Sequence, residues 1–94
     1  MKWLEVIELR TVGSNREMLE SHLQKLMHQR DEEANTQAIK VYSRVMVASD
    51  LSIHLAHDSR NAEPSGSSLG LRLASSLKEF GLVNHSVWIE MSVK

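Results

Sequence analysis

The stretch VYSRVMVASDLSIHLAH, residues 41–57, contains two runs in which nearly every second residue is apolar or branched. This period of two residues is typical of β-strands that have one buried face. Because only a few residues separate the two runs, the stretch predicts an antiparallel hairpin. The alternating positions are Ile39, Val41, Ser43, Val45 and Val47 in the first run and Leu51, Ile53 and Leu55 in the second.

The length of the connecting loop sets the register of this hairpin. A loop at Ser49–Asp50 would place Val45 opposite His54 and mix apolar and polar side chains on each face. A longer loop, Ala48–Asp50, pairs Val45 with Ile53 and keeps one face apolar, so the sequence favours it. On the other face this register places Arg44 opposite His54, Tyr42 opposite Ala56 and Met46 opposite Ser52.

Length and composition restrict the class of protein. A chain of 94 residues is the size of one domain, residues 1–94. The formal charge of -1 provides no field that would attract nucleic acid or an anionic membrane, and the absence of cysteine excludes disulfides and thiolate metal sites. Charged residues interrupt the apolar start of the chain, MKWLEVIELR, which argues against a signal peptide or a membrane span. We expect a cytoplasmic protein.

The stretch from Trp3 to Val12 is rich in apolar and β-branched residues and predicts the first strand. A strand that is apolar on both sides is usually central in its sheet. We expect Ile7 and Leu9 to face the main core. One alternation contains Trp3, Ile7 and Leu9, and the other contains Leu4, Val6 and Val12 together with Glu8 and Arg10.

A first helix is predicted after Gly13. Ser14 and Glu17 fit the S-x-x-E capping box, in which the two side chains satisfy amides at the start of a helix. An apolar stripe at helical spacing follows, and we expect it to pack on the sheet rather than to line a cofactor site. The stripe consists of Met18, Leu19, His22, Leu23, Leu26 and Met27. The polar residues 31–37 are expected to connect this helix to the hairpin.

The stretch DSRNAEPSGSS, residues 58–68, contains the only proline and has neither strand nor helix periodicity. Long loops of this kind are often functional, so the segment is either a flap over a site or an anion cradle formed by residues 65–68 at a helix start. The alternative is a simple linker that ends in a helix cap. A phosphate-binding loop of the G-x-x-x-x-G-K-[ST] type would need a lysine and a second glycine that are missing here.

A second helix is predicted from Leu69 to Phe80, with an apolar stripe at helical spacing, and Gly81 suits the left-handed position after a helix. The last strand is predicted from Val83 to Val93. Its apolar face carries His85, Val87, Ile89, Met91 and Val93, and its other face carries Ser86, Trp88, Glu90 and Ser92.

The predicted order is β-α-β-β-α-β, the ferredoxin-like α+β arrangement, in which two helices cover one face of a four-stranded antiparallel sheet. The first and third strands should be central. The uncovered face would carry more apolar and aromatic surface than a monomer normally exposes, so we expect a homodimer through this face. The face is expected to carry Tyr42, Arg44, Met46, His54, Ala56, Trp88 and Glu90, with Leu4, Val6, Glu8 and Arg10.

The polar and aromatic residues on that face are the candidate ligand-binding residues: Tyr42, Arg44, His54, Trp88 and Glu90. His54, between Arg44 and Glu8, is the candidate for proton transfer. The alternative is a hydrogen-bonded network that seals a dimer interface, since buried polar groups must be paired in either case.

The run HLAHD, residues 54–58, resembles a metal-binding motif. Residues three apart on a strand point to opposite faces, so His54 and His57 cannot share a metal ion. We therefore expect no metal site. We also expect no cofactor.

The whole chain resembles the dimeric α+β barrel superfamily, most nearly its antibiotic-biosynthesis-monooxygenase-like members, through its topology and through SDLSIHL at 49–55 and EFGLVNHSVWIE at 79–90. The resemblance implies that two chains pack sheet against sheet and that small organic ligands sit between sheet and helices. Haem-degrading members use an asparagine on the first strand and a histidine on the second helix. Neither is present here, so the resemblance gives no support for haem degradation and assigns no catalytic residue.

Two functions are therefore expected. The first is a homodimer that binds a small organic ligand, either without catalysis or as a cofactor-independent monooxygenase-like enzyme. The alternative is a non-catalytic regulatory or interaction module, with its ligand near Gly13 or the 60–68 loop. An RNA-recognition module would need exposed aromatic residues on central strands and a basic surface, and the sequence predicts neither.

Overall fold

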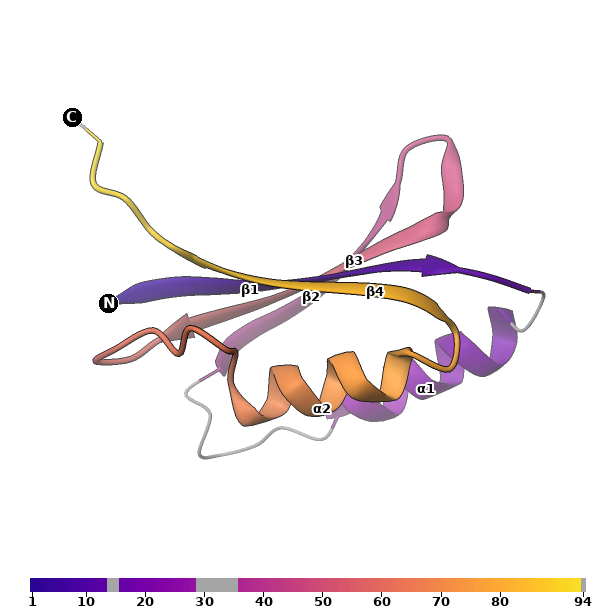
Figure 1. The fold of residues 1–94 in the computed structure, drawn as a ribbon, viewed down its shortest axis with the longest axis horizontal. Coiled ribbons are helices and arrows are strands. Elements are labelled where there is room, and N and C mark those ends of the chain that lie inside the picture. The colour runs from indigo at the N-terminus through magenta and orange to yellow at the C-terminus, as the bar shows by residue number, and fades with distance from the viewer. Residues whose placement is uncertain (14–15, 29–35, 94) are drawn as a thin grey trace.

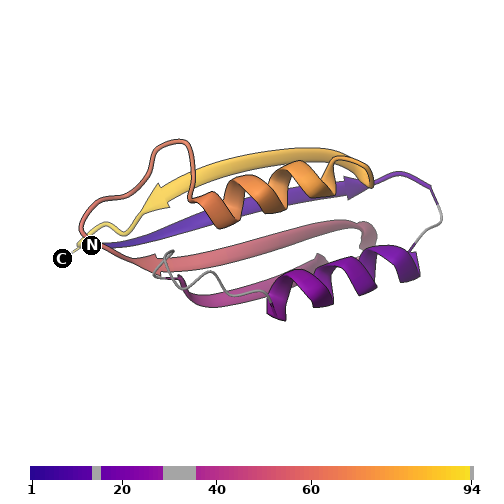
Figure 2. The same cartoon turned by 90° about the horizontal axis from the view of Figure 1, so that it is seen from below.

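The computed structural model describes residues 1–13, 16–28 and 36–93. These residues form one four-stranded antiparallel sheet with two helices on the same side of it (Figure 1). Figure 2, seen from the helix side, places α2 along the β4 side of the sheet and α1 along the β2 side. The elements are β1 (Lys2–Thr11), α1 (Arg16–His28), β2 (Thr36–Arg44), β3 (Val47–Asp58), α2 (Ser68–Leu77) and β4 (Gly81–Ile89).

The strand order is β2-β3-β1-β4, which confirms that the first and third strands are central and that the fold is ferredoxin-like. Along β1, every second residue from Trp3 to Leu9 is buried against the helices. Ile7 and Leu9 therefore face the main core, as predicted, and Glu5 shares their side of the sheet.

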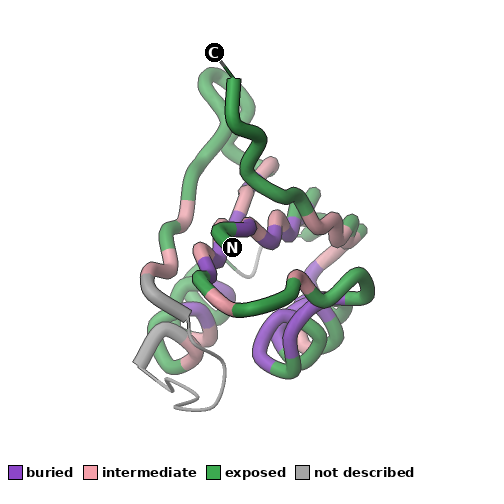
Figure 3. The backbone as a smooth tube through the Cα atoms, turned by 90° about the vertical axis from the view of Figure 1, so that its left-hand side faces the viewer, coloured by how far each residue is buried: buried purple, intermediate pink, exposed green. Residues whose placement is uncertain are grey.

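The core lies where the sheet and the two helices meet (Figure 3). The predicted stripe of α2 is buried, although the helix begins at Ser68 and ends at Leu77 rather than running to Phe80. His22 lies half-buried at the edge of the α1 stripe, beside the ring of Phe80. The buried core residues are Ile7, Leu9, Leu19, Leu23, Leu51, Ile53, Leu55, Leu69, Leu73, Ala74, Leu77 and Phe80.

The predicted register of the β2–β3 hairpin is wrong. The chain turns at Val45–Met46, so Val41, not Val45, lies opposite Ile53, and Lys40, not Arg44, lies opposite His54. Tyr42 lies opposite Ser52 rather than Ala56. The apolar alternation through the turn is misleading, because Val45 is 86% exposed and Met46 is 96% exposed.

The reason for this register is that β3 pairs with β1 as far as Asp50 and is held there by side chains. The Thr11 hydroxyl donates to the carbonyl of Ser49 at 3.0 Å, and Arg16 donates to the carbonyl of Ala48 at 2.7 Å. These contacts keep residues 48–50 in the strand, so the reversal moves to the preceding residues. Met46 adopts a φ of 67°, the left-handed conformation required at one position of such tight turns.

The last strand also differs from its prediction, since β4 begins at Gly81 and ends at Ile89. Gly81 is not in the left-handed region. It pairs with Thr11, and a Cβ at this position would overlap the carbonyl group of Arg10. Gly81 therefore permits a close approach of two strands rather than ending a helix.

Two predictions fall wholly or partly outside the described residues. Ser14 of the capping box is one of them, and α1 is described from Arg16 with Glu17 in its first turn. Most of the predicted 31–37 connection also lies outside the description, but its last residues, Thr36 and Gln37, belong to β2. In the described part of the chain, neither helix has the length and apolar character needed to cross a membrane.

The face of the sheet that points away from the helices is termed the open face. Its side chains form rows across the strands, because residues paired between neighbouring strands point to the same side. In the order β2, β3, β1, β4, the apolar row is Ala38, Ala56, Leu4 and Trp88. The next rows are Lys40, His54, Val6 and Ser86, and then Tyr42, Ser52, Glu8 and Asn84. The charged row is Asp50, Arg10 and Leu82, with Arg44 beside it on β2.

Candidate functional site

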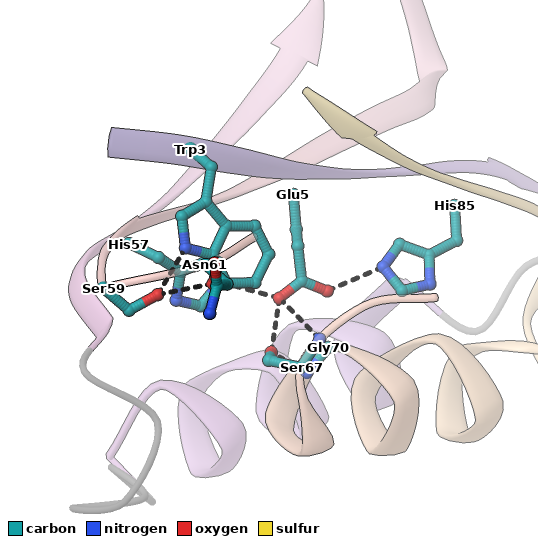
Figure 4. A network of polar contacts seen from close by, with 8 residues as sticks. All are labelled: Trp3, Glu5, His57, Ser59, Asn61, Ser67, Gly70 and His85. Carbon is teal, nitrogen blue, oxygen red and sulfur yellow. Dashed lines mark hydrogen bonds and ion pairs between the residues drawn. The ribbon is translucent and has the colours of Figure 1, made fainter. Parts of the chain in front are cut away.

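A buried polar cluster lies between the sheet and the start of α2 (Figure 4). We call it the Glu5 cluster, and it consists of Glu5, His57, Ser67 and His85. Glu5, His57 and His85 come from β1, β3 and β4 and share the helix-facing side of the sheet. Glu5 is 0% exposed and His57 is 2% exposed, so the carboxyl group and one imidazole are removed from water.

The carboxyl group of Glu5 is held by four groups. Oε1 lies 2.6 Å from Nε2 of His57 and accepts from the backbone N–H of Ser67 at 3.1 Å and from the Ser67 hydroxyl. Oε2 lies 2.7 Å from Nε2 of His85. The two oxygens of a carboxylate have enough lone pairs to accept all of these bonds when each histidine carries its N–H at Nε2.

This carboxylate also satisfies the start of α2. Ser67 is the N-cap, and its hydroxyl oxygen accepts from the backbone N–H of Gly70 at 3.0 Å. A Cβ at Gly70 would overlap the carboxyl group of Glu5, so the helix start approaches β1 closely. A helix start attracts anions through its unpaired amides and its dipole. The anion at the predicted 65–68 cradle is therefore the chain's own Glu5.

Trp3 extends this cluster towards the loop before α2. Its ring stacks on that of His57, with the ring centroids 4.1 Å apart, and its Nε1–H donates to the hydroxyl of Ser59 at 2.9 Å. The Ser59 hydroxyl donates to the carbonyl of Asn61 at 2.9 Å. These contacts tie the start of the 58–68 loop to the sheet (Figure 4).

The satisfied bonding of the Glu5 cluster favours a structural role. Buried polar groups are stable only when they are paired, and a network of this kind fixes one arrangement of the elements that supply it. Sequence reasoning missed the cluster. The available signal was that Glu5 shares the parity of Ile7 and Leu9, and that His57 shares the parity of Ile53 and Leu55.

A second site is a groove on the open face, at the end of the sheet where the hairpin curls away from the helices (Figure 1). Its volume is about 520 Å³. Its floor and walls combine aliphatic, aromatic and charged side chains. The lining residues are Glu8, Leu9, Arg10, Tyr42, Ser43, Arg44, Asp50, Leu51, Ser52, Leu82, Val83 and Asn84.

Asp50 organises the charged end of this groove. Its Oδ1 accepts from Nε of Arg10 at 3.3 Å, and its Oδ2 accepts from an N–H of Arg44 at 3.2 Å. The carboxylate is mostly shielded while both guanidinium groups are largely exposed. Each arginine uses one of its five N–H donors in these bonds, so the others can reach a ligand.

The structure brings together three of the five predicted site residues. Tyr42 and Arg44 line the groove. His54 lies just outside it, with its ring centroid 4.6 Å from that of Tyr42 and its Nε2 2.9 Å from the hydroxyl of Ser52, which does line the groove. The predicted neighbour of His54, Arg44, is replaced by Lys40 because the hairpin register differs.

The other two predicted site residues lie away from the groove. Trp88 belongs to the apolar row at the opposite end of the open face, where its Nε1–H donates to the hydroxyl of Ser86 at 2.8 Å. Glu90 follows the end of β4, and its backbone N–H donates to the carbonyl of Lys2. These two residues therefore do not share a site with Tyr42 and Arg44.

The family resemblance implies a ligand site between the sheet and the helices, and the sequence predicts that His54 and His57 point to opposite faces of a strand. Among the described residues, apolar side chains pack between the sheet and the helices beside the Glu5 cluster, and the cavity among Leu23, Ile53 and Leu73 measures about 10 Å³. A space of that size holds at most one water molecule. His54 and His57 point to opposite faces of β3, as predicted.

Comparison with known proteins bears on the fold. No protein-family model matches the sequence, and no curated protein matches it significantly. The structure is similar to that of Rv0793 from Mycobacterium tuberculosis, with a TM-score of 0.73 and 16% identity, over 99% of this chain and 98% of that chain. At this level of identity the likeness shows that the two chains share a fold over their whole length.

Proposed function

We propose that the chain is a homodimeric α+β barrel protein that binds a small organic molecule in the open-face groove. The groove itself carries this proposal. Its volume of about 520 Å³ falls in the range of small-molecule sites, roughly 300–1,000 Å³. It also has a mixed composition, with apolar surface from Leu82 and the ring of Tyr42 and a few convergent polar groups such as Arg44 and Asn84.

The apolar end of the open face supports the homodimer. Trp88 is 59% exposed, and it shares its row with Leu4, Ala38 and Ala56. The helices cover only the other side of the sheet. A contiguous apolar surface of this kind marks an interaction site, and tryptophan is one of the residues that most often anchor such a site.

Replacing Trp88 by Glu is expected to convert the dimer into a monomer, because a charge would be buried in the apolar row. Light scattering at micromolar concentration measures the change in mass. The matched control is Leu71→Glu, which introduces the same charge at an exposed leucine of α2 on the far side of the molecule. A Trp88→Glu variant that dimerises as tightly as Leu71→Glu would contradict an interface through the apolar row, and a monomeric parent would contradict the dimer itself.

The groove also allows a cofactor-independent, monooxygenase-like form of this function. Such chemistry needs a proton acceptor beside an apolar site. His54 meets this need indirectly, since its Nε2 contacts the Ser52 hydroxyl in the groove wall. In the non-catalytic form, His54 only packs on the ring of Tyr42 and bonds to the hydroxyl of Ser52.

Binding of the probe para-nitrophenol tests both the catalytic and the non-catalytic form of the proposed function. It is expected to bind in the millimolar range, about -4 kcal/mol, as suits a small aromatic ligand. Arg44→Gln should weaken binding roughly fivefold through loss of a charged donor, whereas Arg60→Gln, in the exposed 58–68 loop, should leave binding unchanged. Calorimetry measures the affinity.

The absorbance of the bound probe separates catalysis from simple binding, because it reports the fraction of phenolate. If His54 accepts the proton of the probe, His54→Gln should still bind the probe but should show a smaller fraction of bound phenolate than the parent. An unchanged phenolate signal in His54→Gln would remove His54 as the base and leave the non-catalytic form. Absence of binding to the parent protein, or equal binding by Arg44→Gln, would contradict the groove as a ligand site.

A further inference from the structure

We infer that the two-fold axis of the dimer runs parallel to the strands, so that β2 of one copy faces β4 of its partner and the partner completes the ligand groove. This inference rests on the proposed homodimer and makes it specific. It follows from the distribution of side chains along and across the open face.

The open face changes in character from one end of its strands to the other. Leu4 and Trp88 form the apolar row at one end, and Asp50 and Arg10 form the charged row at the other. The face also changes across its width. Within the apolar row, the two alanines come from β2 and β3, and the two large residues come from β1 and β4.

A closed dimer that packs these faces together has its two-fold axis in the plane between the sheets. If the axis ran across the strands, each sheet would be reversed end for end. The apolar row of one copy would then cover the charged row of the other, burying Arg10 and Asp50 against Leu4 and Ala56. Burial of charges against apolar groups is costly, so this arrangement is disfavoured.

If the axis runs along the strands, each row covers its own copy and only the order of strands is reversed. Trp88 then lies over the partner's Ala38, and Leu4 lies over the partner's Ala56. Each large side chain therefore meets a small one, and both copies gain the same contact. Packing of large on small side chains across a sheet interface fills the space between the two sheets.

The two rows that contain Glu8 and Arg10 are also complementary in this arrangement. The side chain of Glu8 is exposed and has no hydrogen bond or ion pair among the described residues, and it comes to face the partner's Ser52. Arg10 faces the partner's Asp50, and Tyr42 faces the partner's Asn84. Oppositely charged and hydrogen-bonding groups thus face one another across the space between the two sheets.

The groove lies at the charged end, so the two copies enclose it there rather than filling it. Tyr42 and Arg44 on β2 form one wall, and the partner's Leu82 and the partner's Asn84 on β4 form the facing wall. The hairpin rises from the open face at this end (Figure 1). An axis along the strands places the β2–β3 hairpins of both copies at the same end of the dimer, where they flank the shared cavity. The ligand site is therefore incomplete in a monomer.

An exchange of large and small residues tests the axis directly. Ala38→Trp should place two tryptophans against each other, and Trp88→Ala should leave a void, so each variant is expected to dimerise at least tenfold more weakly than the parent. Mixed together, they should form heterodimers in large excess over either homodimer, because the new Trp faces the new Ala. The chain that carries both changes should regain the homodimer. Native mass spectrometry counts each species.

The controls separate this inference from the proposed function. A dimeric parent whose two variants mix without preference for the heterodimer, or whose double variant stays weak, would overturn the axis and leave the homodimer standing. A monomeric parent would overturn both. Circular dichroism checks folding, and Ala38→Leu with Trp88→Val repeats the test with a smaller change in volume.

The shared site has its own measurement. Trp88→Glu changes no residue that lines the groove. Its monomer should nevertheless bind para-nitrophenol at least fivefold more weakly than the parent dimer, because the partner's wall is missing. Equal affinity of this monomer and the dimer would show that the partner contributes nothing to the groove.

Discussion

Replacement of Ile53 by Asp is expected to unfold the protein, whereas Ser52→Asp should fold normally. Ile53 is 1% exposed in the centre of the core, on the helix-facing side of β3. The substitution removes about 2–5 kcal/mol of apolar packing and adds the cost of a buried carboxylate, which together match the whole stability of a small domain, about 5–15 kcal/mol.

Ser52 is the matched control because it is the next residue of the same strand and points to the open face. An Asp there lies opposite Glu8 and costs only the modest repulsion of a cross-strand like-charge pair. Far-ultraviolet circular dichroism and urea unfolding measure both variants. Equal loss of structure in the two variants, or tolerance of both, would contradict the assignment of faces in β3.

This assignment of faces follows from the sequence alone, and so does the fold. The alternation in Leu51, Ile53 and Leu55 indicates which side of β3 is buried, and the order of elements places β1 and β3 in the centre. These patterns are reliable because one-residue shifts would expose a whole row of apolar side chains. The open face follows from the same topology.

The hairpin register does not follow from the sequence because it depends on contacts made elsewhere in the chain. Val45 and Val47 continue the apolar alternation, yet both lie near an exposed turn. The pairing of β3 with β1, together with the Arg16 contact from the start of α1, decides where the chain reverses. An apolar alternation near a turn does not indicate a buried face unless another element packs on that face.

The candidate sites were predictable to different degrees. Tyr42 and Arg44 were predicted as site residues because the topology identifies the open face. The groove itself was not predictable, because it forms where the hairpin curls and where Asp50 bridges two arginines. The Glu5 cluster joins residues from three strands and a helix start. Each of its members alone looks like an ordinary polar residue, and only the tertiary arrangement brings them together.

The Glu5 cluster gives the other large expected effect: Glu5→Ala should lower the free energy of unfolding by about 3–5 kcal/mol. The change leaves both imidazoles and the amide and hydroxyl of Ser67 without their common acceptor in a buried site. The loss of each such bond in a buried site costs about 1–3 kcal/mol, and relaxation of the helix start recovers part of the total. Urea unfolding at neutral pH measures the loss.

Two variants show whether the effect comes from the lost acceptor. Glu8→Ala removes the same side chain from the open face of the same strand and should change stability little, because Glu8 is exposed and has no partner among the described residues. Glu5→Gln keeps the shape but retains one acceptor oxygen in place of two, so its stability should lie between those of Glu5→Ala and the parent. If Glu5→Ala were no less stable than Glu8→Ala, the cluster would not hold α2 on the sheet. In that case the docking of α2 would depend on its apolar stripe, Leu69, Leu73 and Leu77, alone.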